Sequence, residues 1–227
     1  MKKSERRQAF VASLPVLFGY VFLGIAFGVT LSQAGYGPAW ALACSGFVYA
    51  GSLEFVMVPL LAGGADLLTV ALTAFMVNAR HIFYGISFIE RFRTMKGLYP
   101  YMVFSLTDET YSVFCSLPGD APDGVLFRVS LYDQCYWVLG SLLGALLAVG
   151  LPVDLTGIDF SMTALFIVIV VEKAMAAENR VPLLLGGAVS LTALFLLGPS
   201  SFLAPALLVT ALVLAGMNIV KKGEQAA

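Results

Sequence analysis

Charge is scarce in this sequence. Only 12% of its 227 residues are Asp, Glu, Lys or Arg, against roughly 25% in an ordinary soluble domain. Hydrophobic residues make up 59%, and the mean hydropathy is +0.90. A water-soluble core cannot absorb that much apolar surface, so we expect a membrane protein whose main solvent is lipid.

Cysteine, histidine and basic runs are also rare. Cys44, Cys115 and Cys135 are far apart, so we expect neither a disulfide framework nor a cysteine-based metal site. His81 is the only histidine, so no second histidine could share a metal ion with it. The sequence also contains no recognisable motif for a catalytic nucleophile. We therefore predict no metal, no cofactor and no enzyme activity. A net charge of −1, with no basic run beyond the termini, argues against nucleic acid as a partner.

Long apolar segments are what the sequence does contain. About 20 apolar residues span a bilayer as a helix, and turns rich in Gly and Pro separate the segments here. The sequence predicts an all-α, polytopic membrane protein with about seven or eight membrane segments, forming one transporter domain over residues 1–227. The expected segments are 9–33, 39–62, 67–89, 98–117, 125–150, 160–177, 181–197 and 202–220.

The topology depends on where the basic residues fall. Residues 2–7 predict an uncleaved first helix with a cytoplasmic start. If every segment crosses, the basic group at 91–96 lies outside, against the positive-inside rule. The conflict disappears if segment 39–62 enters the membrane and returns to the same side. The acidic 118–124 loop would then lie outside. We therefore predict one or two discontinuous segments, the second at about 160–180.

Two small-residue spacings allow close helix contact. Gly24 and Gly28 are four residues apart, as are Gly140 and Gly144. Such spacings let the backbones of two membrane helices approach each other. In a chain with 22 glycines, chance matches are an equally good explanation.

Two charged tetrapeptides lie within apolar segments, Asn78-Ala79-Arg80-His81 and Thr107-Asp108-Glu109-Thr110. A charge near the bilayer centre costs roughly 3 kcal/mol or more. Arg80 therefore needs a permanent counter-anion or a substrate carboxylate; snorkelling towards the 91–96 group is the alternative. His81 titrates near neutral pH, which suits either proton coupling or a structural hydrogen bond.

The acidic residues divide into binding and proton-exchanging groups. Asp108 and Glu109 point about 100° apart on a helix, so at most one faces Arg80 squarely. We predict that Asp108 holds a substrate ammonium and that Glu109 carries the exchangeable proton, a static buried ion pair being the alternative. Glu54 follows Gly51-Ser52, where an interrupted helix would offer N–H groups to a carboxylate while Glu54 attracts an ammonium.

Other polar and aromatic side chains complete the predicted site. The substrate-binding set is Gly51, Ser52, Glu54, Asn78, Arg80 and Asp108, and the proton-coupling set is Glu109 and His81. The predicted cavity wall consists of Phe55, Phe83, Tyr84, Phe104, Asp133 and Gln134. Asp133 and Gln134 fit an interfacial position equally well, because aromatic neighbours such as those at 136 and 137 collect there.

At these residues the chain resembles the AzlC family, the large subunit of branched-chain amino-acid exporters, over essentially its whole length. The resemblance rests on YAGSLEF at 49–55, NARHIFYG at 78–85, TDET at 107–110, YDQCYW at 132–137 and GIDFSMTALF at 157–166. It implies export of leucine, isoleucine and valine from the cytoplasm across the cytoplasmic (inner) membrane, with a small AzlD-like membrane subunit as partner. Proton antiport is an expectation for such an exporter. The chain departs from the family at Glu54, where glutamine is more usual.

The predicted function is therefore secondary transport. An intramembrane enzyme would need a catalytic set that the sequence does not offer. A passive channel would tolerate the paired charges less well. An assembly subunit that stabilises a partner and binds no substrate remains the alternative.

Overall fold

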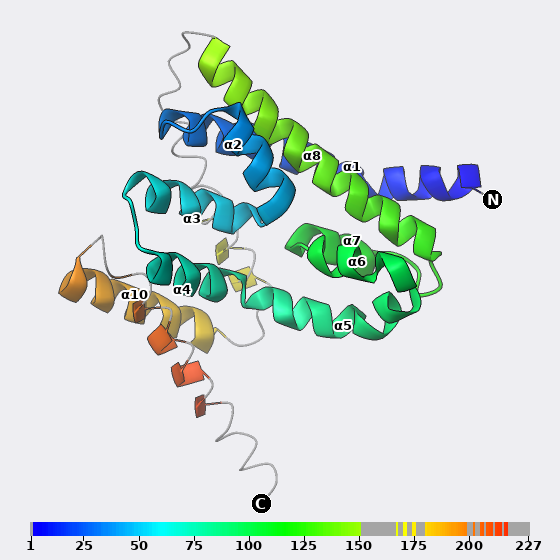
Figure 1. Cartoon of the computed structure of the whole chain (residues 1–227). Helices are drawn as coiled ribbons and strands as arrows, with labels where there is room; N and C mark the ends of the chain where they lie inside the picture. Colours follow the sequence, from blue (N-terminus) through cyan, green and yellow to red (C-terminus); the bar gives the residue numbers. More distant parts are fainter. Residues whose placement is uncertain are drawn as a thin grey trace, which may run out of the picture. The chain divides into compact units, whose positions relative to one another are not determined.

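The computed structural model describes residues 2–150 and 180–198, together with 167, 170–171, 174–175, 202, 205–206, 208–210, 212–214 and 216–217. Every element in this part is a helix, as predicted. The elements are α1 (Lys2–Gln33), α2 (Pro38–Ala43), the π-helix η1 (Cys44–Val48), α3 (Gly51–Ala62), α4 (Leu67–Asn78), α5 (Arg80–Thr94), the 3-10 helix η2 (Lys96–Leu98), α6 (Tyr99–Phe104), α7 (Asp108–Ser116), α8 (Asp123–Gly150) and α10 (Val181–Leu197) (Figure 1).

The chain forms two compact units, one of residues 1–65 and 77–162, the other of 66–76 and 163–227. Among the described residues, one helix is long and apolar enough to cross a membrane, Ser4–Gln33. Four shorter apolar helices are Pro38–Val48, Gly51–Ala62, Leu67–Asn78 and Val181–Leu197. The predicted segments 160–177 and 202–220 lie for the most part outside the described residues.

Helices α1 and α8 form the most extensive contact of the first unit and run side by side (Figure 1). They are parallel: Arg128 Nη1 pairs with Glu5 at 2.9 Å near the start of both helices, and Ser32 Oγ donates to Ala145 O near their ends. Their backbones touch through the four glycines of the two small-residue spacings. A Cβ on Gly24 would lie 2.9 Å from Ser141 N, and one on Gly140 would lie 2.7 Å from Val21 O.

The two glycine spacings therefore lie in one interface, in which the glycines of each helix face the backbone of the other. A Cβ on Gly28 would overlap Ser141 O, and one on Gly144 would overlap Ile25 O. No side chain separates the two helices at these points, which is the close approach that small residues permit. The coincidence of two glycine motifs in the sequence thus has a structural cause.

A first interrupted segment leaves the C-terminal end of α1 and returns towards it. It passes through α2 and η1 to Tyr49, whose ring lies 6.5 Å from that of Tyr20 at mid-length of α1. In α3 the ring of Phe55 lies 5.8 Å from that of Phe27, so the chain has turned back along α1. The helix is interrupted at Tyr49–Ala50, next to the predicted position.

The interruption is a strained piece of backbone. Five residues form a π-helix, which is rare and often found at functional sites. Tyr49 then adopts φ +46°, a left-handed conformation uncommon for a residue with a Cβ. Gln134 Nε2 donates to Gly46 O at 3.1 Å, so a side chain of α8 takes up one backbone carbonyl at the break. The break needs such partners, because lipid cannot form hydrogen bonds with unpaired backbone groups.

The predicted continuous helix over 98–117 is wrong. Two short helices occupy it, α6 and α7, separated by residues 105–107. Thr107 begins α7 as its N-cap and accepts a hydrogen bond from Thr110 N, because a threonine side chain satisfies an N–H of the first helical turn. The segment over 67–89 is also divided, since a turn at Ala79 separates α4 from α5.

The 118–124 loop lies at the same end as the N-terminus, whereas the sequence analysis placed the two on opposite sides of the membrane. Arg91, near the end of α5, pairs with Asp123 at 3.0 Å and donates to Gly119 O and Ala121 O. Arg128 bonds both Gly124 O and Glu5, which brings the start of α1 to this end. The segment of α6 and α7 therefore enters and leaves at one end of the α1–α8 pair.

Candidate functional site

The tips of the two interrupted segments meet near the middle of α8. Gly46 of the first segment contacts Gln134, and Thr110 of the second donates to Asp133 Oδ2 at 2.8 Å. Tyr101 of α6 donates to Gln134 Oε1 at 2.9 Å. One turn of α8 thus connects both tips, which came from opposite ends of the α1–α8 pair. Asp133 is fully buried, and its predicted place in the cavity wall stays a prediction.

Glu54 is the second buried carboxyl of the site. It is fully buried, and its Oε1 accepts from Trp137 Nε1 and from Ala50 N, each at 3.0 Å. Its side chain therefore reaches back over the start of α3 and ties the break to α8. Gly51 makes this approach possible, since a Cβ there would lie 3.2 Å from Cη2 of the Trp137 ring.

Several buried polar atoms at the tips have no hydrogen-bond partner among the described residues. They are Glu54 Oε2, Ser105 Oγ, Ser130 Oγ and Asp133 Oδ1. An unpaired buried polar group costs about 1–3 kcal/mol, and buried polar groups are paired in most proteins. Asp133 and Trp137, the partner of Glu54, are four residues apart and so lie on one face of α8. The two free carboxyl oxygens thus belong to one region of the fold.

A chain of hydroxyls joins Asp133 to Glu109. Tyr20 Oη donates to Glu109 Oε2 at 2.7 Å and lies 2.6 Å from Thr107 Oγ1. Thr107 Oγ1 in turn lies 3.2 Å from Thr110 Oγ1, which donates to Asp133. Glu109 is exposed, whereas Tyr20, Thr107 and Thr110 are buried. The two carboxyls are therefore connected through the interior.

The basic tetrapeptide approaches the acidic one through His81. Its Nε2 lies 3.8 Å from Asp108 Oδ1, an ion pair when the imidazole is protonated. Both side chains are about one quarter exposed, at 26% and 27%. The backbone of Arg80 begins α5, but its side chain lies outside the described residues, so its predicted pairing with Asp108 stays a prediction. Asn78 ends α4, and its Oδ1 is buried without a hydrogen-bond partner in the described part.

The predicted cavity wall divides into packed and exposed rings. Phe55 is fully buried against Phe27 and Trp137. Tyr84 stacks on Tyr111 with ring centres 4.6 Å apart. Phe104 is 41% exposed, with its ring 6.1 Å from that of Tyr49. The side chain of Phe83 lies outside the described residues. Ser52 is half-buried in the first turn of α3.

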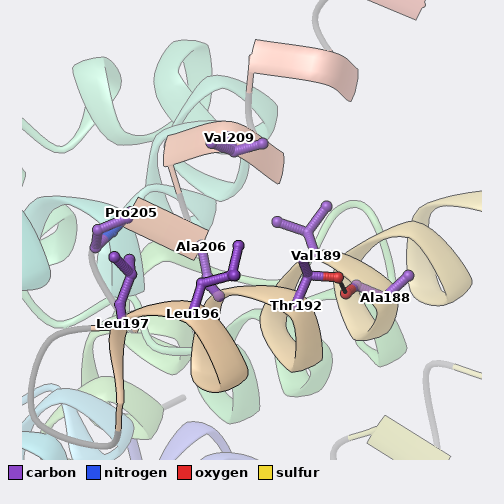
Figure 2. A pocket seen from close by; sticks show the side chains of 9 residues that line it. Ala188, Val189, Thr192, Leu196, Leu197, Pro205, Ala206 and Val209 are labelled. Carbon is purple, nitrogen blue, oxygen red and sulfur yellow. Dashed lines mark hydrogen bonds between the residues drawn. The ribbon is translucent and has the colours of Figure 1, made fainter.

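An apolar hollow in the second unit has different chemistry. Figure 2 shows its lining of α10 side chains together with Pro205, Ala206 and Val209. Among its described lining residues, Thr192 has the one hydroxyl, which donates to Ala188 O of its own helix. These residues include no charged side chain that could pair with the ammonium or the carboxylate of an amino acid.

Sequence reasoning missed Tyr20 and gave Trp137 no role. Tyr20 lies in an otherwise apolar helix, and a phenol hydroxyl in that setting was the available signal, because buried Tyr hydroxyls usually have a partner. The Trp137 N–H carried the same signal. Neither partner, Glu109 or Glu54, is near in sequence.

Comparison with known proteins identifies the family. The AzlC family model matches residues 15–151. The chain belongs to the AzlC family. A relative in Bacillus subtilis (strain 168), named "Branched-chain amino acid transport protein AzlC", is 35% identical over 89% of this chain and 81% of its own length.

Other relatives are named as membrane proteins. An "Uncharacterized membrane protein" of Helicobacter pylori (strain ATCC 700392 / 26695) is 36% identical over 92% of both chains. The Escherichia coli (strain K12) "Inner membrane protein YgaZ" is 29% identical over 68% of this chain and 67% of its own length. No solved structure matches. Membership of this family supports membrane localisation and a transport role rather than an enzymatic one.

Proposed function

We propose that this AzlC-family protein is a multi-pass secondary transporter of the cytoplasmic (inner) membrane. It exports branched-chain and other hydrophobic amino acids, coupled to protons and together with a small AzlD-like subunit. The name of the Bacillus relative supports the substrate class. One structural observation carries the proposal: two interrupted segments meet at mid-length of α1 and α8 around two buried carboxyls. Interrupted helices at the membrane midplane are where transporters hold substrate.

The free oxygens of the two carboxyls suit an ammonium group. Glu54 Oε2 and Asp133 Oδ1 are buried acceptors without a partner among the described residues. An ammonium brings three N–H donors, and its positive charge offsets the cost of burying a carboxylate. The substrate carboxylate would lie at the first turn of α3, near Gly51 and Ser52, or against Arg80. Its aliphatic side chain would contact the rings around Phe104.

The distribution of cations supports a cytoplasmic N-terminus. The end of the α1–α8 pair that holds the N-terminus carries eight of the 13 Lys and Arg residues, and cytoplasmic loops are rich in such residues. The eight are Lys2, Lys3, Arg6, Arg7, Arg91, Arg93, Lys96 and Arg128. In this orientation α6 and α7 enter from the cytoplasm and α2, η1 and α3 from outside.

Reconstitution tests this function. Proteoliposomes with this chain and its small membrane partner are loaded with radiolabelled leucine, and efflux is followed with and without a pH gradient. We expect gradient-dependent efflux, and at least a tenfold loss in Glu54→Gln and Asp133→Asn, which keep the shape of each side chain. Asp120→Asn, in the exposed 118–124 loop, is the matched control and should transport normally. Absence of both leucine binding and efflux in the unaltered protein would favour the assembly subunit instead.

A further inference from the structure

The hydroxyl chain between Glu109 and Asp133 has a property that substrate binding does not require. It runs without a gap from an exposed carboxyl to a fully buried one. The successive oxygens are separated by 2.7, 2.6, 3.2 and 2.8 Å. These distances fall within or close to ordinary hydrogen-bond range.

We propose that Tyr20, Thr107 and Thr110 form a proton path between Glu109 and Asp133, and that Asp133 binds a proton and the substrate ammonium in alternation. The inference rests on the proposed function and adds the route and the residue at which proton and substrate compete. Each hydroxyl can accept one proton on its oxygen while it releases its own. Once Glu109 takes up a proton, its carboxyl donates to Tyr20 Oη, and the Tyr20 O–H turns from Glu109 to Thr107 Oγ1. Thr107 then passes its proton to Thr110 and Thr110 passes its own to Asp133 Oδ2, so the intervening groups end neutral.

The environment of Asp133 suits this alternation. Tyr20 links the path to α1, and four titratable groups interact electrostatically with Asp133, namely Glu109 of α7, Tyr49 at the first break, Tyr101 of α6 and Tyr136 of α8. None of these four described groups is a cation, so within the described part of the chain an ionised Asp133 would be compensated by the substrate ammonium, and a proton would neutralise it when the ammonium is absent. Its second oxygen, Oδ1, is buried without a partner among the described residues and is free for the ammonium.

A structural role predicts different consequences for the same residues. Thr107 caps α7, so its replacement would perturb the helix as well as the path. Tyr20→Phe removes only one hydroxyl and keeps the ring, which packs edge-on against Trp137 at 5.3 Å. Thr110→Val removes the link to Asp133 at nearly constant volume, and Thr110→Ser restores it. Tyr132→Phe removes a phenol hydroxyl outside the path and is the control.

Two measurements on the purified full chain with its small membrane partner test the proposal. Infrared spectroscopy after a pH jump follows protonation of the Asp133 carboxyl, whose band is assigned by its loss in Asp133→Asn. We expect protonation to slow at least tenfold in Tyr20→Phe and Thr110→Val, and to keep its normal rate in Thr110→Ser and Tyr132→Phe. Proton-driven leucine efflux should fall at least tenfold in the first two variants, whereas leucine–leucine exchange, which needs no net proton transfer, should persist.

The outcomes separate the path from the proposed function. Normal protonation rates in Tyr20→Phe and Thr110→Val would overturn the path, even if the protein exports leucine. Equal loss of exchange and of proton-driven efflux, with unchanged protonation rates, would also overturn it and make these residues structural. Slowed protonation in a protein that moves no leucine would retain the path and reject the export function.

Discussion

Trp137 Nε1 and Glu54 Oε1 are 3.0 Å apart, although 83 residues separate them in the sequence. The same carboxylate oxygen accepts from Ala50 N, so one atom joins α8 to the interrupted backbone of the first segment. The indole ring also stacks on Phe27 of α1. Trp137 thus holds three parts of the fold together at the point where a helix is broken.

Removal of the indole N–H should loosen this junction. Trp137→Phe keeps an aromatic ring but leaves Oε1 with Ala50 N as its one donor, and the loss of one hydrogen bond costs about 0.5–1.5 kcal/mol. We expect a lower thermal unfolding midpoint in detergent. Trp40→Phe is the matched control, because Trp40 is 54% exposed and should be replaceable without loss. Equal midpoints for both variants would show that the bond contributes nothing.

The glycine interface predicts opposite effects of one substitution at two places on α1. Gly28→Ala places a methyl against Ser141 O, and such overpacking costs about 1–3 kcal/mol. At Gly19 a Cβ meets nothing within 4 Å, so Gly19→Ala should be neutral or stabilising by up to about 1 kcal/mol through helix propensity. Unfolding in denaturant, followed by tryptophan fluorescence, measures both changes. A Gly28→Ala variant as stable as the original protein would contradict the interface.

Arg91 should fix the 118–124 loop. Its side chain bonds Asp123 and two loop carbonyls, so Arg91→Ala should expose the loop to protease and raise the cleavage rate several-fold. Arg93→Ala is the control, because Arg93 pairs with Glu90 of its own helix at a highly exposed position. Cleavage of the two variants at the same rate would argue against the tether. The cleaved side of the membrane, determined in sealed vesicles, would also orient the protein.

We expect the turn before α4 to respond to pH through Asp66. Thr69 Oγ1 donates to its carboxylate at 2.7 Å and lowers the pKa of Asp66, with help from the Thr69 and Leu68 N–H groups. Because the pKa of Asp66 is lower in the folded protein, its ionised carboxylate stabilises the turn fully above the ordinary pKa of about 3.9. This stabilisation is lost as the pH falls through the pKa of Asp66 in the folded protein. Thr69→Val should raise the pKa of Asp66 in an NMR titration, whereas Thr192→Val should not.

Much of this architecture could be predicted from the sequence, because its signals are local. The interruption before Glu54 followed from Gly51-Ser52, and the glycine spacings named the residues at which α1 and α8 touch. The break at residues 105–107 was missed because apolar length was given more weight than capping chemistry. Thr107 followed by Asp108 and Glu109 has the pattern of a helix start.

The site itself depends on long-range contacts that no local pattern encodes. The sequence is compatible with Asp133 in a cavity or at an interface, and no local pattern indicates its hydrogen bond with Thr110, 23 residues away. Tyr20 lies 89 residues from Glu109, so nothing near it in the chain indicates a carboxyl partner. His81 Nε2 lies 3.8 Å from Asp108 Oδ1, and no local pattern singles out this contact.

The backbone contact between α1 and α8 also limits how this protein can move. Helices separated by long side chains can slide as rotamers change, but at Gly28 and Gly144 the two main chains touch and no side chain is present to rearrange. The pair should therefore behave as a stiff frame during the transport cycle. The movement that opens the site to one side or the other must then come from the two interrupted segments. The short helices of these segments end where they contact α8.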